Sequence, residues 1–256
     1  QQCQKGCSSM LPKPPDCPIP GARGFMRPEG TGSLGVLMLG ESAGAHEVRE
    51  GLPFRPTAPA GSVLERAIKR AGYERQQFRI WNMIGCQPKD NKLDHMPYEQ
   101  AALTHCKPRL DAIIAEMKPR CIMTLGAVPT RALTGMTGYK QSIGLLRGFL
   151  LPSLDYACPV LPSYHPSYLR RGAKGKDESG AAVKGEKGGG MSLFGVLMGD
   201  MHRAVQVARD KEKACSTTER ARLTKNFKVN TEDEISAFAH FVKDNAFPSH
   251  TTSKLQ

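Results

Sequence analysis

The chain has no run of about 18 apolar residues, and this absence predicts that no segment of its 256 residues spans a membrane. Its start is polar, unlike the basic and then apolar start of a secretory signal, so we expect a cytoplasmic protein. None of its eight cysteines forms a CxxC pair, so spacing alone is a weak signal for metal. Without a secretory signal, the cysteines are expected to be reduced thiols or metal ligands rather than disulfides. The start at Gln1 instead of a methionine suggests a fragment or a processed chain.

Acidic residues are outnumbered by basic ones. The 36 lysines and arginines against 24 acidic residues give a net charge of +12 and a pI near 9.4. This excess predicts a polyanionic partner, most simply nucleic acid, and hence a location at the nucleoid. A basic surface that is merely solvated is the alternative. The length is sufficient for one well-buried domain with residues left over.

Short apolar runs alternate with segments of helical periodicity. The runs expected to be strands are residues 36–39, 78–81, 121–125 and 158–163. The expected helices are residues 62–71, two stretches within 97–117 divided near Pro108, 126–133 and 191–210. This alternation predicts an α/β fold with three layers, in which helices cover both faces of a central, mainly parallel, four-stranded sheet.

Two segments have a composition that differs from the rest. Residues 172–190 contain one apolar residue larger than alanine, Val183, and are expected to be a mobile insertion. The lysines of this insertion suit contacts with DNA phosphates, although a solvated linker explains them as well. We expect residues 1–212 to form one domain. Residues 213–256 are then a polar linker and a short helix that opens with a capping box at Thr231, where another domain can start.

Residues 40–54, with the sequence GESAGAHEVREGLPF, directly follow the first expected strand. In a parallel sheet, the loop at the carboxyl end of a strand is where ligands bind. The loop holds two carboxylates, Glu41 and Glu47, and it ends at an aromatic residue, Phe54. Gly40 and Gly44 allow a substrate to approach the backbone closely. These residues alone fit an ordinary polar turn equally well.

A second motif far along the chain, His165-Pro-Ser-Tyr-Leu169, favours the ligand-binding loop over the ordinary turn. Together with Gly40-Glu-Ser-Ala-Gly44, Glu47 and Gly51-Leu-Pro-Phe54, it resembles the paired motifs of the uracil-DNA glycosylase superfamily, specifically its iron–sulfur (family 4) branch. Residues 81–86, WNMIGC, resemble the family's strand that ends in an asparagine and a cluster cysteine. The resemblance covers roughly residues 17–210.

The resemblance implies a DNA repair enzyme. Such an enzyme flips deoxyuridine out of single- or double-stranded DNA, hydrolyses its N-glycosidic bond, releases uracil and leaves an abasic site. Phe54 would stack under the flipped base, although a core phenylalanine is the alternative. Asn82 would read the N3/O4 edge of uracil, because its amide offers both a donor and an acceptor. His165 would donate a hydrogen bond to O2, where charge builds as the bond breaks.

Both carboxylates of the first motif are catalytic candidates. Glu41 and Glu47 would position or activate water and would support the cationic sugar electrostatically. Gly40 and Ser42 would lie against the substrate. Ser42 and Ala43 replace the Ala-Pro that the family pattern predicts, and this departure puts the reaction rate in doubt more than the fold.

The second motif also carries the expected DNA contacts. Leu169 resembles the residue that enters the duplex and fills the vacated base site. Arg170 and its neighbour Arg171 suit contacts with phosphate, which weaken as salt increases.

The resemblance further implies a [4Fe–4S] cluster held by four thiolates. The expected ligands are Cys17, Cys86, Cys106 and Cys7, with Cys3 as the substitute for Cys7. In the family, a cysteine lies three residues before the position of Cys17, whereas Pro14 stands there in this chain, so the fourth ligand is the least secure. Zinc is the alternative metal, since four thiolates also suit it.

The remaining cysteines are not assigned to the cluster. Cys121 lies in an expected strand and is predicted to pack in the core, whereas Cys158 and Cys215 receive no role.

Two other functions stay open from the sequence. One is a non-catalytic iron–sulfur module that binds DNA within a larger replication or repair protein. The other is the superfamily branch that traps itself covalently on DNA through a histidine in a basic, KRRIH-like loop. Residues 88–98 contain His95 but no such basic run, so this branch fits least well.

Overall fold

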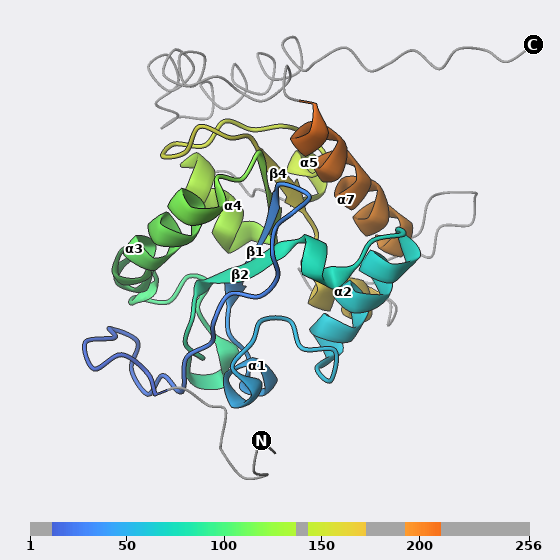
Figure 1. Ribbon diagram of the computed structural model, residues 1–256. Coiled ribbons are helices and arrows are strands. Elements are labelled where there is room, and N and C mark those ends of the chain that lie inside the picture. The colour runs from blue at the N-terminus through green and yellow to red at the C-terminus, as the bar shows by residue number, and fades with distance from the viewer. Residues whose placement is uncertain (1–11, 137–142, 173–192, 211–256) are drawn as a thin grey trace, which may run out of the picture.

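The computed structural model of the chain describes residues 12–136, 143–172 and 193–210. Its centre is a four-stranded sheet in the order β2-β1-β3-β4, in which all neighbouring strands are parallel (Figure 1). The strands are β1 (Val36–Ser42), β2 (Arg79–Ile84), β3 (Cys121–Leu125) and β4 (Val160–Ser163). The predicted parallel α/β architecture is therefore confirmed.

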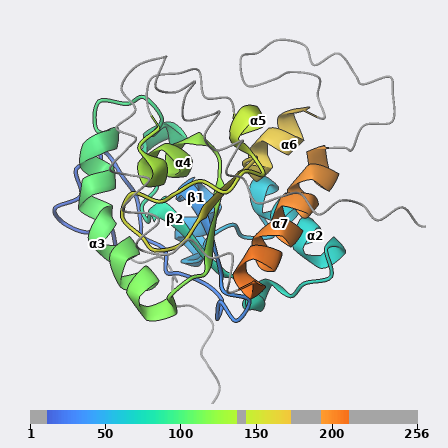
Figure 2. The ribbon, with the colours of Figure 1, turned by 90° about the horizontal axis from the view of Figure 1, so that it is seen from above.

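One face of the sheet is covered by α3 (Glu99–Met117) and α4 (Ala127–Thr134). Leu37, Leu39 and Ile122 point into this layer, because alternate side chains of a strand face opposite sides. Figures 1 and 2 show α3 and α4 together on this side of the sheet.

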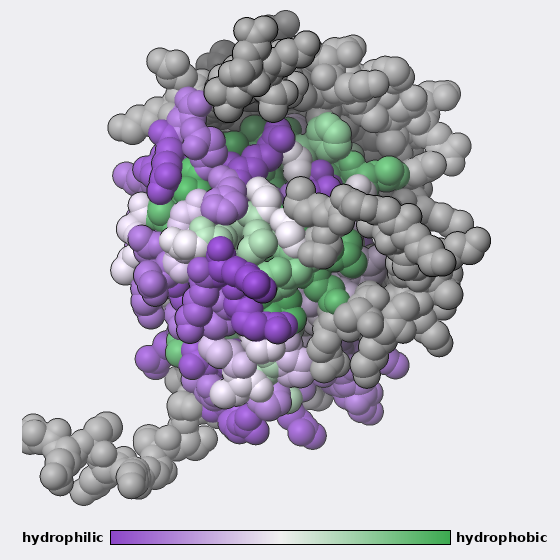
Figure 3. Space-filling view, turned by 90° about the vertical axis from the view of Figure 1, so that its right-hand side faces the viewer, coloured by the Kyte–Doolittle hydropathy of each residue, from purple (hydrophilic) through white to green (hydrophobic). Residues whose placement is uncertain are grey.

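The opposite face is covered by α2 (Pro59–Arg70) and α7 (Leu193–Arg209). Val36, Met38 and Met123 point into this second layer, between the strands that point the other way. The strands are buried on both faces, as expected for a parallel sheet. Seen from the side of α2 and α7, hydrophobic residues also reach the surface in a band beside hydrophilic ones (Figure 3).

Several short elements were not predicted. They are α1 (Ala45–Glu50), α5 (Ile143–Leu146), α6 (Pro166–Gly172) and the 3₁₀ turns η1 (Arg75–Gln77) and η2 (Lys89–Asn91). Each is too short for a helical period to stand out in the sequence. Two of them, α1 and α6, follow the carboxyl ends of β1 and β4; α1 carries Glu47 of the first motif, and α6 begins directly after His165 of the second.

The predicted division of residues 97–117 into two helices is wrong, because α3 is continuous with Pro108 inside it. Proline has no N–H to donate to the carbonyl four residues earlier, which costs a helix about 3 kcal/mol. The burial of Ala102, Leu110 and Ile113 against the sheet offsets this loss. Tertiary packing thus overrides the local signal.

Some predictions fall outside the described residues. These are the lysine-rich insertion, most of which lies in residues 173–192, and the helix expected after Thr231. The predicted closing helix is confirmed over Leu193–Arg209. Within the described ranges, no helix combines the length and the apolar character needed to cross a membrane.

Gly61 allows α2 to pack directly on the turn that contains Phe54. A Cβ atom at position 61 would lie 2.0 Å from the carbonyl oxygen of Arg55 and 2.4 Å from that of Phe54. Both contacts are with backbone, which cannot move aside as a flexible side chain can.

We expect the substitution Gly61→Ala to lower the free energy of unfolding by about 1–3 kcal/mol, because it overpacks this contact. Gly199→Ala in α7 is the matched control, since a Cβ there has no neighbour within 4 Å. The control should raise stability by up to about 1 kcal/mol through helix propensity. Urea denaturation of both variants measures the difference, and equal effects would contradict the close packing.

Candidate active site

The two motifs meet at the carboxyl edge of the sheet. Gly40 near the end of β1 pairs in register with Asn82 of β2. His165 lies two residues beyond the end of β4 and directly before α6. Parallel strands bring their carboxyl ends to one edge, which is where open α/β sheets bind ligands.

Gly40, Phe54 and Asn82 are in close contact. A Cβ atom at position 40 would lie 2.1 Å from Oδ1 of Asn82 and 2.6 Å from Cζ of Phe54. The absence of a side chain at Gly40 therefore lets the amide and the phenyl ring share this space. Phe54 and Asn82 are almost completely buried, with 3% and 1% of their surface exposed.

His165 lies beside the same phenyl ring. The centroids of the Phe54 and His165 rings are 5.7 Å apart, with 43° between the ring planes. Nδ1 of His165 accepts a hydrogen bond from the N–H of Ser167 at 3.2 Å. In a neutral imidazole with Nδ1 as acceptor, Nε2 carries the proton. The ring thus presents a donor at Nε2.

Glu47 connects the loop to the strand. Its carboxylate accepts hydrogen bonds from the N–H groups of Gly44 and Phe54 at 2.5 Å and from Nδ2 of Asn82 at 3.3 Å. Burial raises the pKa of Glu47, while these hydrogen bonds and the nearby charge of Arg75 act in the opposite direction. A carboxylate with both oxygens engaged in this way is suited to holding its neighbours in place.

The contact with Glu47 also orients the amide of Asn82. Nδ2 is directed to Glu47, and Oδ1 is buried with no hydrogen-bond partner among the described residues. This orphaned acceptor lies at the point where Gly40 and Phe54 meet. A buried acceptor without a partner is costly in a folded protein, and a ligand donor at this point would satisfy it.

Glu41 has a different environment from Glu47. Its pKa is raised to about 7, first by burial and then by the negative charges of Asp94 and Glu99, while the positive charge of Arg131 acts in the opposite direction. Arg131 itself donates to Asp94 at 2.7 Å and to Glu99 at 2.9 Å. The two carboxylates of the first motif therefore have different electrostatic partners.

The sequence analysis missed Asp94, Glu99 and Arg131. They come from a loop, from α3 and from α4, so no local motif marks them. Asp94, His95 and Glu99 also place one ligand atom each within 4.8 Å of one another. Asp94 and His95 are exposed, and the ion pairs with Arg131 already neutralise part of this acidic group.

Three of the predicted cluster cysteines lie close together. The pKa of Cys86 is raised to about 12, first by burial and then by the neighbouring Cys17 and Cys106. Burial also raises the pKa of Cys106, while Arg109 lowers it. The thiols come from the loop before β1, the segment after β2, and α3. Cys3 and Cys7 lie outside the described residues.

The other cysteines in the described ranges are separate from this group. Cys121 is completely buried in β3, which confirms its predicted place in the core, and burial together with Cys158 raises its pKa. Cys215 lies outside the described residues.

The remaining predicted site residues lie at the end of β1 and in α6. Ser42 is the last residue of β1 and pairs with Ile84. Leu169 is 8% exposed and packs with the layer of α2 and α7, so its entry into a duplex would require it to leave this cluster. Arg170 belongs to α6, and its side chain is outside the described part of the structure.

Comparison with known proteins identifies the family. Residues 28–184 match the family described as the uracil DNA glycosylase superfamily. The type-4 uracil-DNA glycosylase of Pyrobaculum aerophilum is 30% identical over 169 residues, which cover 65% of this chain and 83% of that protein. The Thermotoga maritima protein of the same name is 34% identical over 56% of this chain and 70% of its own length. For the Sulfurisphaera tokodaii protein the identity is 33%, over 54% of this chain and 62% of that protein, so this match spans less than two thirds of its length. The chain therefore belongs to the uracil-DNA glycosylase superfamily, in its type-4 branch.

Proposed function

We propose that this protein hydrolyses the N-glycosidic bond of deoxyuridine in DNA, which releases uracil and leaves an abasic site. The observation that carries the proposal is the convergence of Phe54, Asn82 and His165 at one edge of the sheet. These residues come from three distant parts of the sequence and supply a stacking ring, an amide and an imidazole donor. The names of the type-4 relatives support the same activity.

Asn82 would distinguish uracil from cytosine. Its orphaned Oδ1 would accept a hydrogen bond from N3–H of uracil. Nδ2 donates to Glu47 at 3.3 Å and to Sδ of Met26 at 3.7 Å, so a hydrogen bond from Nδ2 to O4 would replace the weaker contact with the sulfur. Cytosine has an acceptor at N3 and a donor at its amino group, so the amide would have to turn over to bind it. The bond from Nδ2 to Glu47 opposes that rotation. A site with fixed buried polar groups rejects the wrong pattern strongly, because the groups would be left unpaired.

His165 would stabilise the departing base. As the glycosidic bond breaks, negative charge develops on uracil, and Nε2–H of a neutral His165 would donate to O2. Phe54 would stack against the flipped base and hold it beside this donor. Gly40, which has no side chain, lets Phe54 and Asn82 lie together against the backbone of β1, where the base would bind.

The two glutamates would have separate tasks. Glu47 would position Phe54 and Asn82, to which it is hydrogen-bonded. Glu41, with a pKa of about 7, is the better candidate for positioning or activating water and for supporting the cationic sugar. Ser42, next to it in β1, would lie against the substrate.

The donor set of Cys17, Cys86 and Cys106 fits a thiolate-bound cluster. Crowded, buried thiols oppose one another's ionisation, and a metal group removes that penalty by taking up the thiolates. We propose that these residues hold a [4Fe–4S] cluster, with Cys7 or Cys3 as the fourth ligand and zinc as the alternative metal. The group would tie the cysteine-rich start of the chain to β2 and α3, as a structural support.

DNA binding would rest on the positive charge of the chain and on the end of α6. Arg170 and Arg171 would contact phosphates, and Leu169 would fill the vacated base site. We propose residues 1–212 as the glycosylase domain and residues 213–256 as a link to another replication or repair domain. The expected place of action is the nucleoid.

The activity is tested with uracil-containing single-stranded DNA, followed by alkali treatment and a denaturing gel. The wild-type protein should cleave the strand at uracil. Asn82→Ala and His165→Ala should each lower the single-turnover rate by about 10²–10³-fold, because each removes a preorganised hydrogen bond. His202→Ala, which changes a histidine that contacts Tyr73, is the matched control and should retain activity.

An unchanged strand with the wild-type protein would refute the proposal and support the non-catalytic DNA-binding module. A heat-stable, shifted band would instead indicate the branch that attaches covalently to DNA.

The dependence of the rate on pH tests the role of Glu41. If the ionised carboxylate acts, the single-turnover rate should rise with pH and reach half its plateau near the pKa of about 7. Arg131→Gln should move this midpoint to higher pH, because it removes a positive charge that lowers the pKa of Glu41. Glu99→Gln should move the midpoint to lower pH. Glu41→Gln should lower the plateau by on the order of 10²-fold and abolish the midpoint. A profile that all three variants leave unchanged would exclude Glu41 as the titrating group.

The metal is tested by the absorbance and iron content of protein purified without oxygen. A [4Fe–4S] cluster should give a broad band at roughly 400 nm and about four iron atoms per chain. Cys86→Ala and Cys106→Ala should lose both signals, whereas the control Cys121→Ala, in β3, should keep them. Stoichiometric zinc without the band would favour the alternative metal.

A further inference from the structure

The backbone at Phe54 is held in a conformation that phenylalanine rarely adopts. Its φ angle is +43°, in the left-handed region that favours glycine. Such a residue costs on the order of 1–3 kcal/mol and persists only where the surroundings enforce it. The contacts that enforce it therefore also set the position of the ring that lies beside His165.

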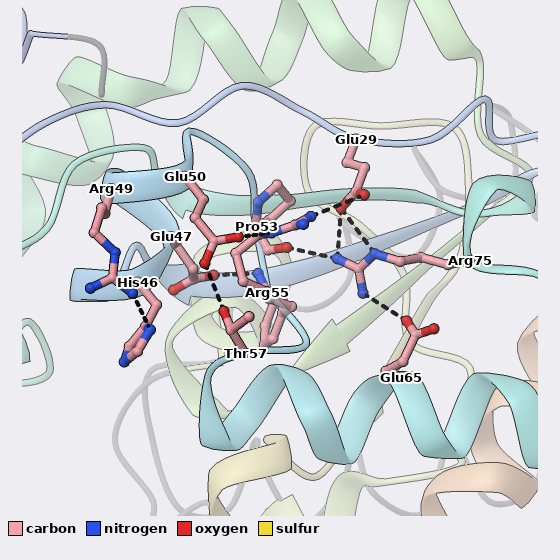
Figure 4. Close-up of polar contacts among 11 residues, drawn as sticks. Glu29, His46, Glu47, Arg49, Glu50, Pro53, Arg55, Thr57, Glu65 and Arg75 are labelled. Atoms are coloured by element: carbon pink, nitrogen blue, oxygen red, sulfur yellow. Dashed lines mark hydrogen bonds and ion pairs between the residues drawn. The ribbon is translucent and has the colours of Figure 1, made fainter. Parts of the chain in front are cut away.

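The peptide group between Pro53 and Phe54 is held from both sides. Its N–H donates to Oε1 of Glu47 at 2.5 Å, and its carbonyl oxygen accepts a hydrogen bond from Nη2 of Arg75 at 2.7 Å (Figure 4). Because a peptide group is planar, fixing both of its polar atoms fixes its rotation. The direction in which the chain enters Phe54 is thereby determined.

Arg75 is itself fixed by two carboxylates. Its Nε and Nη2 donate to Oε2 of Glu29 at 3.0 and 2.7 Å, and Nη1 lies 3.6 Å from Oε2 of Glu65. The side chain of Arg75 is 10% exposed and that of Glu29 is 11% exposed, so solvent screens this ion pair little. Figure 4 shows the guanidinium of Arg75 between Glu29, Glu65 and the carbonyl of Pro53.

The partners of Arg75 come from separate parts of the fold. Glu29 belongs to the segment before β1 and forms a bridge with Ile80 of β2, and Glu65 lies in α2. Arg55 reinforces this arrangement, since it binds the other oxygen of Glu29 at 3.4 Å. The guanidinium thus connects the turn at Phe54 to the sheet through Glu29 and to α2 through Glu65, and these contacts hold the turn in place.

We propose that Arg75 is a positioning residue for uracil excision, which acts through the Pro53–Phe54 peptide on the ring that stacks against the base. This inference rests on the proposed function. The positive charge of Arg75 also helps to position the site. It opposes the rise that burial causes in the pKa of Glu47, and it thus favours the ionised form that holds Phe54 and Asn82. A residue needed only for stability would affect neither the position of the Phe54 ring nor the ionisation of Glu47.

A double-mutant cycle of Arg75→Gln and Phe54→Ala tests the proposal. Arg75→Gln should lower the single-turnover rate on uracil-containing DNA by on the order of tenfold to a hundredfold, because it loosens the geometry of the bound base. The dissociation constant for DNA should change by less than about threefold, since the Arg75 side chain is only 10% exposed and is paired with Glu29. Arg75→Gln should slow the Phe54→Ala variant clearly less than it slows the wild type, because Arg75 acts mainly through the ring that Phe54→Ala has already removed.

Arg79→Gln is the matched control. Arg79 is also an arginine of low exposure, 17%, and its Nη1 donates to a backbone carbonyl, that of Gly30, at 2.8 Å. The hydrogen bonds of Arg79 are made with Gly30 and Glu116 and not with the turn at Phe54, so this variant should keep the wild-type rate within about threefold. Rates are compared at a temperature at which circular dichroism shows every variant folded. Arg75→Lys, which keeps the charge but not the planar fork, serves as the variant that retains folding and should fall between wild type and Arg75→Gln.

The outcomes separate the two proposals. A wild-type protein without excision activity overturns the proposed function. An active wild type overturns the role of Arg75 if Arg75→Gln equals Arg79→Gln, or if the effects of Arg75→Gln and Phe54→Ala multiply in the double variant.

Discussion

The hydrogen bonds of the Glu47 carboxylate are the constraint on which the site depends. This one partly buried side chain accepts hydrogen bonds from the start of α1, from the turn at Phe54 and from Asn82 in the middle of β2. It thereby joins a loop to the rigid sheet and leaves Oδ1 of Asn82 as the acceptor at the site. Burying a carboxylate is unfavourable unless several donors surround it, so the loop conformation and the charge of Glu47 depend on each other.

The environments of Glu41, in β1, and Glu47, in α1, explain how one short motif can provide both rigidity and proton chemistry. Glu47 is surrounded by donors and by the charge of Arg75, whereas Glu41 faces the negative charges of Asp94 and Glu99. Arg131 balances those acidic residues, so the pKa of Glu41 stays near 7 instead of rising further. Carboxyl groups in such different surroundings are suited to different tasks within one site.

Much of the fold could be predicted from the sequence, because apolar periodicity reports burial directly. Strand β3 and helices α2, α4 and α7 lie close to where the pattern places them. The error at Pro108 shows the limit of local signals, since the packing of α3 on the sheet outweighs the loss of one hydrogen bond. The short elements α1 and α6 were missed because helices of six and seven residues are too short for a helical period to stand out.

The sequence by itself determined the family and the chemical types at the site, since the motifs around Glu41 and His165 are contiguous and keep their spacing. Only the tertiary structure decided which of these groups meet: Phe54, Asn82 and His165 converge, while Glu41 takes its charge partners from α3, α4 and a loop. It alone also revealed Arg75 and its ion pairs, which lie outside both motifs. The reason is physical, because hydrogen bonds and charge interactions depend on distance in space, and separation along the chain does not specify that distance.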